Sequence, residues 1–152
     1  MSPPADRYCV VDAQVIGLAN GRSTGPAARD RLKLLMAIAR GLAVPVKNPR
    51  LLHDYARLLA NKPLNDIVRA FIQAFDKYGL ANDKGLAARE IEHLRHCRFP
   101  AHDDYLLKAA KDIEGAVVAT EESALMATSS CVYARLKWMI LSPAETLKRW
   151  RL

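Results

Sequence analysis

The stretch YCVVDAQVIGLANG, residues 8–21, contains the signal that decides the fold. Residues 8–11 form a short apolar run rich in β-branched side chains, which predicts a buried strand. Asp12 follows at the point where this strand would end. Because an isolated charge is costly to bury, a carboxylate there must be paired, bind a cation, or face a wet cleft.

The rest of the chain alternates between strand and helix patterns. Further strands are predicted at 42–46, 115–120 and 133–141, with a brief one near 97–99, and helices at 27–41, 49–61, 64–78, 102–114, 123–128 and from 143 onward. This alternation predicts an α/β protein, a three-layer α/β/α sandwich with a central parallel sheet of four to five strands. No repeat or long linker interrupts it, so residues 1–152 are predicted to form a single domain.

Individual residues mark the ends of these elements. Asn48 followed by proline, and Ser142 followed by proline, each combine an N-cap residue with the imino acid favoured at the first helical position. Gly79 is expected to end the helix before it. Pro45 predicts that the strand at 42–46 lies at an edge of the sheet, because proline cannot donate a ladder hydrogen bond.

Composition and charge limit the class of protein. The formal net charge is +7, with basic ends and an acidic middle, which favours either a polyanionic partner or simply a solvated basic surface. Cys9, Cys97 and Cys131 lack CxxC spacing and are expected to be reduced thiols. No apolar run is long enough to span a membrane or to serve as the h-region of a signal peptide, so a cytoplasmic protein without membrane contact is expected.

Six acidic residues stand at positions where a parallel sheet could gather them. They are Asp12, Asp54, Asp103, Asp104, Glu121 and Glu122. The first follows the opening strand, and the two glutamates follow the strand at 115–120, so they are expected at the carboxyl edge of the sheet, where ligands bind. Hard divalent cations relieve the repulsion within such a cluster, and Mg²⁺ prefers oxygen ligands. The alternative is that these acids are ordinary helix-terminal and solvated charges.

Four segments together resemble the PIN-domain family of metal-dependent ribonucleases, which includes the VapC-type toxins of bacterial toxin–antitoxin pairs. They are VVDAQVI at 10–16, PRLLHDYARLL at 49–59, HDDYLLKAAKDIEGAVVATEESAL at 102–125, and LSPAETLKRW at 141–150. The third is the most specific, since it combines an acidic pair, a helix with small residues, a buried strand and a Thr-x-acid motif. The resemblance extends over nearly the whole chain.

The resemblance implies a set of site residues. Asp12, Asp54, Asp103 and Glu122 would be the catalytic acids, with Asp12, Asp103, Asp104 and Glu122 as ligands of Mg²⁺ or Mn²⁺. Thr120 and Ser123 would position water or phosphate. The chain departs from the family in two places: Asp54 stands where glutamate is usual, and Glu122 where aspartate is usual. Each exchange moves a carboxylate by one methylene, which leaves the activity of the site open.

The predicted function is therefore a divalent-metal-dependent endoribonuclease, the toxin of a toxin–antitoxin pair, with RNA as substrate, a small antitoxin as partner and a homodimeric state. The alternative is a weak or inactive PIN-like module that binds RNA or protein. A receiver-like signalling domain would also place an aspartate at a strand end, but the paired acids and the late lysine of that class are missing.

Two further groups of residues raise other functions. Basic residues after the first strand could line an RNA path, or could be a solvated face: Arg22, Arg29, Arg31, Lys33, Lys47 and Arg50. The segment EHLRHC, with His93, His96 and Cys97, and the nearby His102 suggest zinc, but no partner motif has the usual ligand spacing, and helix-surface histidines are the preferred interpretation.

Overall fold

The computed structural model describes residues 7–152, which form an α/β fold around one five-stranded sheet. In the described chain the elements follow in the order β1 (Tyr8–Val11), α1 (Ala13–Ala19), α2 (Pro26–Ala39), β2 (Val44–Lys47), α3 (Pro49–Leu59), α4 (Asp66–Tyr78), β3 (Leu80–Ala81), α5 (Ala88–His96), the 3₁₀ turn η1 (Ala101–Asp103), α6 (Asp104–Ala110), β4 (Val117–Ala119), α7 (Ser123–Met126), α8 (Ser129–Leu136), β5 (Met139–Leu141) and α9 (Pro143–Trp150). The predicted fold class is confirmed.

The sheet has the order β3-β2-β1-β4-β5, and every pair of neighbours is parallel. From β1 the chain adds β2 and β3 on one side, then crosses back to add β4 and β5 on the other. The strand order therefore reverses between β1 and β4. In open parallel sheets this is the place where the loops separate and leave a crevice beyond the carboxyl ends of the strands.

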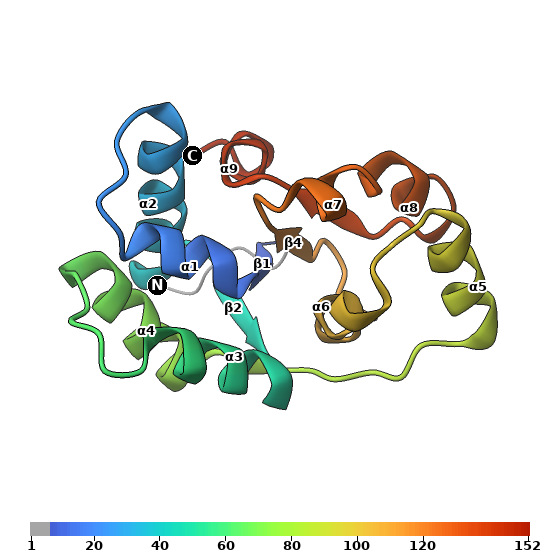
Figure 1. The fold of residues 1–152 in the computed structure, drawn as a ribbon, viewed down its shortest axis with the longest axis horizontal. Coiled ribbons are helices and arrows are strands. Elements are labelled where there is room, and N and C mark those ends of the chain that lie inside the picture. The colour runs from blue at the N-terminus through green and yellow to red at the C-terminus, as the bar shows by residue number, and fades with distance from the viewer. Residues whose placement is uncertain (1–6) are drawn as a thin grey trace.

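Helices cover both faces of the sheet (Figure 1). On one face α2 packs between α4 and α9, and these last two contact the strands β2 and β4–β5. On the other face α6 packs across β1, β2 and β4, and α3 lies next to it. At one end of the molecule α5 packs against α8.

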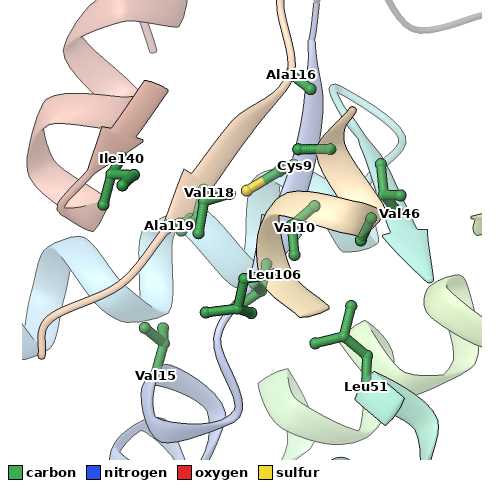
Figure 2. Close-up of a cluster of buried hydrophobic side chains, with 14 of the residues drawn as sticks. Cys9, Val10, Val15, Val46, Leu51, Leu106, Ala116, Val118, Ala119 and Ile140 are labelled. Carbon is green, nitrogen blue, oxygen red and sulfur yellow. The ribbon is translucent and has the colours of Figure 1, made fainter. Parts of the chain in front are cut away.

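The core lies where these layers meet. Figure 2 shows Cys9 and Val10 of β1 and Val118 of β4 between α6 in front and α2 behind. Leu106 of α6 is fully buried against these strands. Because both faces of the central strands are covered, β1 and β4 consist of continuous apolar residues rather than an alternating pattern.

The helix ends confirm the predicted signals. The Asn48 side chain accepts a hydrogen bond from the Leu51 amide, and Gly79 caps the end of α4. Ser142 and Glu145 form a reciprocal capping box at the start of α9. These local motifs are satisfied within a few residues, which explains why they could be recognised without knowledge of the fold.

Three predictions about strands are wrong. The strand at 42–46 is not an edge strand, because β2 lies between β1 and β3. The Val44 amide donates toward β1, so the nitrogen of Pro45 faces the β3 side. Pro45 is tolerated there because β3 begins only opposite Val46, and no ladder hydrogen bond is required of the proline nitrogen. Residues 97–99 form no strand. Of the strand predicted at 133–141, residues 133–136 belong to α8 and only Met139–Leu141 pair with β4.

The prediction of three reduced thiols is also wrong. Cys97 at the end of α5 and Cys131 on α8 form a disulfide, with Cα atoms 5.6 Å apart. The packing of α5 on α8 brings these distant residues together. Cys9 is a free buried thiol. Within residues 7–152, no helix combines the length and the apolar character needed to cross a membrane.

Candidate functional site

The ends of β1 and β4 place Asp12 and Thr120 side by side. Val11 pairs with Ala119 in the sheet. Asp12, directly after β1, donates its amide to the Ala119 carbonyl at 2.9 Å. Thr120 Oγ1 donates a hydrogen bond of 2.8 Å to Asp12 Oδ2 and accepts one of 3.1 Å from the Glu122 amide. Asp12 is 6% exposed and Thr120 is fully buried. The last residues of two neighbouring strands thus fix one carboxylate.

Helix α3 brings the second acid to the same edge. Asp54 is 5% exposed and accepts a hydrogen bond of 3.1 Å from Arg50 Nε, with Arg57 Nη2 at 3.8 Å. The next residue, Tyr55, is buried, and its hydroxyl donates to the Val11 carbonyl at the end of β1. This contact anchors α3 to the strand that carries Asp12.

Asp103 completes the buried set from the turn before α6. It is 9% exposed, and its Oδ2 accepts no hydrogen bond; His102 Nε2 lies 3.4 Å away. The turn is held in place from α3, because Asn48 Nδ2 donates a 3.0 Å hydrogen bond to the Tyr105 carbonyl. A buried carboxylate oxygen without a partner is rare in a folded protein and calls for an explanation such as an ion or a water.

The pKa values show that these acids act on one another. Burial raises the pKa of Asp12, and the nearby Glu122 raises it further, while the hydrogen bond from Thr120 opposes the shift. Burial also raises the pKa of Asp103, with added repulsion from Asp12 and Asp54 and opposing attraction from His102 and Arg50. We call the four acids that share this field the acidic cluster: Asp12, Asp54, Asp103 and Glu122.

The acidic cluster fits a hard divalent cation by its donor chemistry. All of its ligands are carboxylate oxygens, and Asp103 Oδ2 is buried without a hydrogen bond. In residues 7–152, no three of these acids bring ligand atoms within 4.8 Å of one another. The cluster is therefore wider than a closed coordination shell. Mg²⁺ usually keeps several waters and is bound directly through only one or two carboxylates, so a wide cluster suits it.

Two of the six acids singled out in the sequence do not join the cluster. Glu121 forms a two-pronged ion pair with Arg31, at 2.6 Å and 2.8 Å, and Arg31 is itself buried. Asp104 lies 3.5 Å from Lys108 and lines a small pocket beside Phe99. Successive residues at a helix start point in different directions, so Asp104 does not share the buried position of Asp103, and its part in a metal site stays a prediction.

Thr120 lies where it can orient Asp12 rather than contact a substrate directly. Its hydroxyl is fully buried and is used by Asp12 and by the Glu122 amide, so it orients the carboxylate and cannot touch a phosphate. Ser123, at the first turn of α7, is exposed and remains available to a ligand.

The basic residues separate into two groups. Arg22, Arg29 and Lys33 are exposed, around the start of α2, as an RNA path requires. Arg31 is excluded from that path by its pairing with Glu121. Arg50 is half exposed, pairs with Asp54 and lies over the Tyr105 ring at 4.8 Å from its centroid.

Sequence reasoning missed the residues that support the acids. Tyr55 anchors α3, and Asn48 connects α3 to α6 in addition to capping its own helix. Tyr105 lies beside Asp54, and its pKa is raised by burial and by that carboxylate. The only sequence signal was proximity, since Tyr55 and Tyr105 lie one or two positions after a candidate acid.

Comparison with protein-family models, with curated proteins and with solved structures yields no match for this chain.

Proposed function

We propose that the chain is a divalent-metal-dependent endoribonuclease of the PIN-domain type. The observation that carries the proposal is the convergence of four acids from distant segments on the carboxyl edge of β1 and β4. Two of them, Asp12 and Asp103, are buried carboxyl groups with raised pKa values, and Asp103 keeps a buried oxygen that accepts no hydrogen bond. Acidic groups with perturbed pKa values are typical of catalytic sites.

Asp12 and Asp103 are the residues that would hold Mg²⁺ or Mn²⁺. A bound ion of this kind stabilises charge on a phosphodiester and lowers the pKa of a coordinated water. Thr120 keeps the Asp12 carboxylate in one orientation through its 2.8 Å hydrogen bond. Glu122, which is only partly buried, acts as the base that accepts a proton from the attacking water.

The substrate side of the site is basic. Arg22 and Arg29 are exposed and bind the phosphates of the RNA, and Ser123 adds a hydroxyl close to Glu122. Contacts of this kind position a nucleic acid without reading its sequence, and they weaken with salt. The same proposal includes a cytoplasmic location, a homodimer and a small antitoxin that covers the acidic cluster. The homodimer and the antitoxin rest on the family resemblance.

The pairing of Asp54 favours a second candidate, a binding module with little catalytic activity. Arg50 and Arg57 both approach Asp54 Oδ1, at 3.1 Å and 3.8 Å. A carboxylate neutralised by two guanidinium groups is a poor ligand for a cation. In this alternative the protein binds RNA through its basic residues. The remaining acids hold an ion, but the RNA is not cleaved.

The deciding experiment is cleavage of a mixed single-stranded RNA pool with Mn²⁺ or Mg²⁺, with and without EDTA. We expect cleavage by the wild type that EDTA abolishes, and loss of cleavage in Asp12→Asn. The matched control is Asp76→Asn, which removes the same charge from an exposed position on α4 and should cleave like the wild type.

The other outcomes separate the two candidates. RNA that is bound but not cleaved, with Mn²⁺ still raising the melting temperature, supports the binding module. Cleavage that is equal in wild type and Asp12→Asn contradicts the assignment of the site.

A further inference from the structure

A second group of potential metal ligands lies between α5 and α8. His93 and Cys97 are one turn apart on α5 and its C-cap, and Cys131 comes from α8, 34 positions further along the chain. Their ligand atoms all lie within 4.8 Å of one another. In residues 7–152 this is the only such group of three histidine, cysteine or acidic side chains.

One atom of His93 stands at the centre of the group. His93 Nε2 lies 3.3 Å from Cys97 Sγ and 2.8 Å from the Cys131 carbonyl oxygen. In the disulfide form Nε2 carries the proton and donates it to that carbonyl. The ring nitrogen therefore already lies within 4.8 Å of both sulfur atoms. A metal could bind the same nitrogen if the proton were carried by Nδ1 instead.

The ligand types select the metal. Two thiolates and one imidazole are soft to borderline donors, which suit Zn²⁺ and do not suit Mg²⁺ or Mn²⁺. His93 lines an open hollow of about 1040 Å³, together with Glu92, His96 and residues of α8. The His96 ring lies beside the His93 ring, with centroids 5.9 Å apart. A water molecule or His96 can complete the tetrahedron from this side.

We propose that His93, Cys97 and Cys131 form a Zn²⁺ site that is gated by the Cys97–Cys131 disulfide. With the disulfide closed, both sulfur atoms are used in their mutual bond and the site cannot bind. A dithiol reductant transfers two electrons, breaks the S–S bond and becomes a disulfide itself, leaving two thiols. Zn²⁺ then binds both sulfur atoms with release of two protons, and the His93 proton moves from Nε2 to Nδ1.

The inference shares no residue with the acidic cluster, so it stands or falls independently of the proposed nuclease activity. Disulfides are rare in the cytoplasm, where thiols are kept reduced. The cytoplasmic location expected from the sequence would therefore favour the zinc-bound form. Either form joins α5 to α8, by the S–S bond in one case and through the metal in the other.

The test is metal binding by the full chain after reduction and removal of the reductant without air. We expect the reduced chain to bind one Zn²⁺ more than the oxidised chain, since any ion held by carboxylates is common to both. Co²⁺ in place of Zn²⁺ should give the sulfur-to-metal charge-transfer absorption of a two-thiolate site. Bound Zn²⁺ should also protect Cys97 and Cys131 from alkylation, which peptide mapping measures residue by residue, while the buried Cys9 is shielded with or without the metal.

Variants assign the ligands. His93→Gln and Cys131→Ser should each weaken Zn²⁺ binding at least about tenfold, the lower end of what even an outer-shell partner costs. His53→Gln is the matched control, since it removes an exposed histidine from α3 and should bind like the wild type. If a variant fails to fold, the alkylation experiment on the wild type still decides.

Two results would overturn the proposal. One is a reduced chain that binds no more Zn²⁺ or Co²⁺ than the oxidised chain. The other is Zn²⁺ bound without thiolate absorption and without protection of Cys97 and Cys131, which would place the ion elsewhere.

Discussion

Thr120 Oγ1 lies 2.8 Å from Asp12 Oδ2, although the two residues are 108 positions apart in the chain. The hydrogen bond connects the ends of two neighbouring parallel strands at the point where the strand order reverses. It holds a carboxylate that burial and Glu122 both make costly to ionise. The threonine thus stabilises the charged form of the acid that the site requires.

Thr120→Val should destabilise the protein by about 1 to 3 kcal/mol, because it leaves a buried acceptor without its donor. It should also weaken Mn²⁺ binding, since the ionised Asp12 is no longer supported. Urea denaturation and a Mn²⁺ titration measure the two effects. Thr120→Ser keeps the hydroxyl and should recover most of the metal affinity. Equal affinity in the valine and serine variants would contradict the role of the hydrogen bond.

Asp103→Asn should stabilise the metal-free protein at neutral pH. The pKa of Asp103 is raised in the folded state above its ordinary value of 3.8. The protonated carboxyl group therefore contributes stability to the folded protein, and this contribution is complete below pH 3.8. The contribution is lost as the pH rises through the raised pKa, because the folded state then gives up a proton that it holds more tightly than the unfolded chain.

The pH dependence provides the measurement for this variant. In EDTA at pH 7, Asp103→Asn should melt at a higher temperature than the wild type. The difference should vanish below about pH 3.8. Adding Mn²⁺ should raise the melting temperature of the wild type more than that of the variant, because ligand binding to the folded state adds stability. A wild type that is more stable than the variant at pH 7 in EDTA would refute the assignment.

The neighbours Glu121 and Glu122 should respond in opposite ways. Glu121→Gln breaks the two-pronged pair with the buried Arg31 and should cost about 3 kcal/mol of unfolding free energy, because it leaves a buried charge without its partner. Glu122→Gln should leave stability nearly unchanged and abolish RNA cleavage. Denaturation curves and cleavage rates for both variants check this. If Glu121→Gln abolished cleavage and Glu122→Gln cost stability instead, the catalytic role would belong to Glu121 and the structural role to Glu122.

Tyr55→Phe should reduce stability by about 1 kcal/mol through loss of one buried hydrogen bond to the Val11 carbonyl. The ring remains packed against Phe71 and Phe75, so the core is not disturbed. Because Tyr55 anchors the helix that carries Asp54, cleavage should fall together with stability. Unchanged stability would show that the hydroxyl contributes no net free energy.

Much of the fold was predictable because its signals are local. The apolar run at residues 8–11, the caps at Asn48 and Ser142 and the stop at Gly79 each depend on side chains a few positions apart. The errors fell where tertiary packing outweighs local preference. Pro45 has the local character of an edge residue, but it lies in an inner strand because β3 pairs with β2 from Val46 onward. Residues 133–136 are apolar enough for a strand but form the end of α8 against β5.

The candidate site was predictable in its acids but not in its supports. Asp12, Asp103 and Glu122 directly precede helices, and Asp12 also follows a strand, where sequence reasoning can look for them; Asp54 lies in the middle of α3 and was indicated by the family resemblance. The pairing of Arg31 with Glu121, the burial of Thr120 and the link from Asn48 to Tyr105 join residues that are far apart in the chain. Local periodicity contains no information about such contacts.

The sequence by itself determined the α/β class, the parallel sheet and the positions where acids could gather, because strand and helix periods and helix caps are properties of neighbouring residues. Only the tertiary structure decided which acids share one electrostatic field, that Glu121 pairs with the distant Arg31, and that Cys97 lies beside Cys131. Those outcomes depend on distances between segments brought together by burial of the core, and burial is a property of the whole chain.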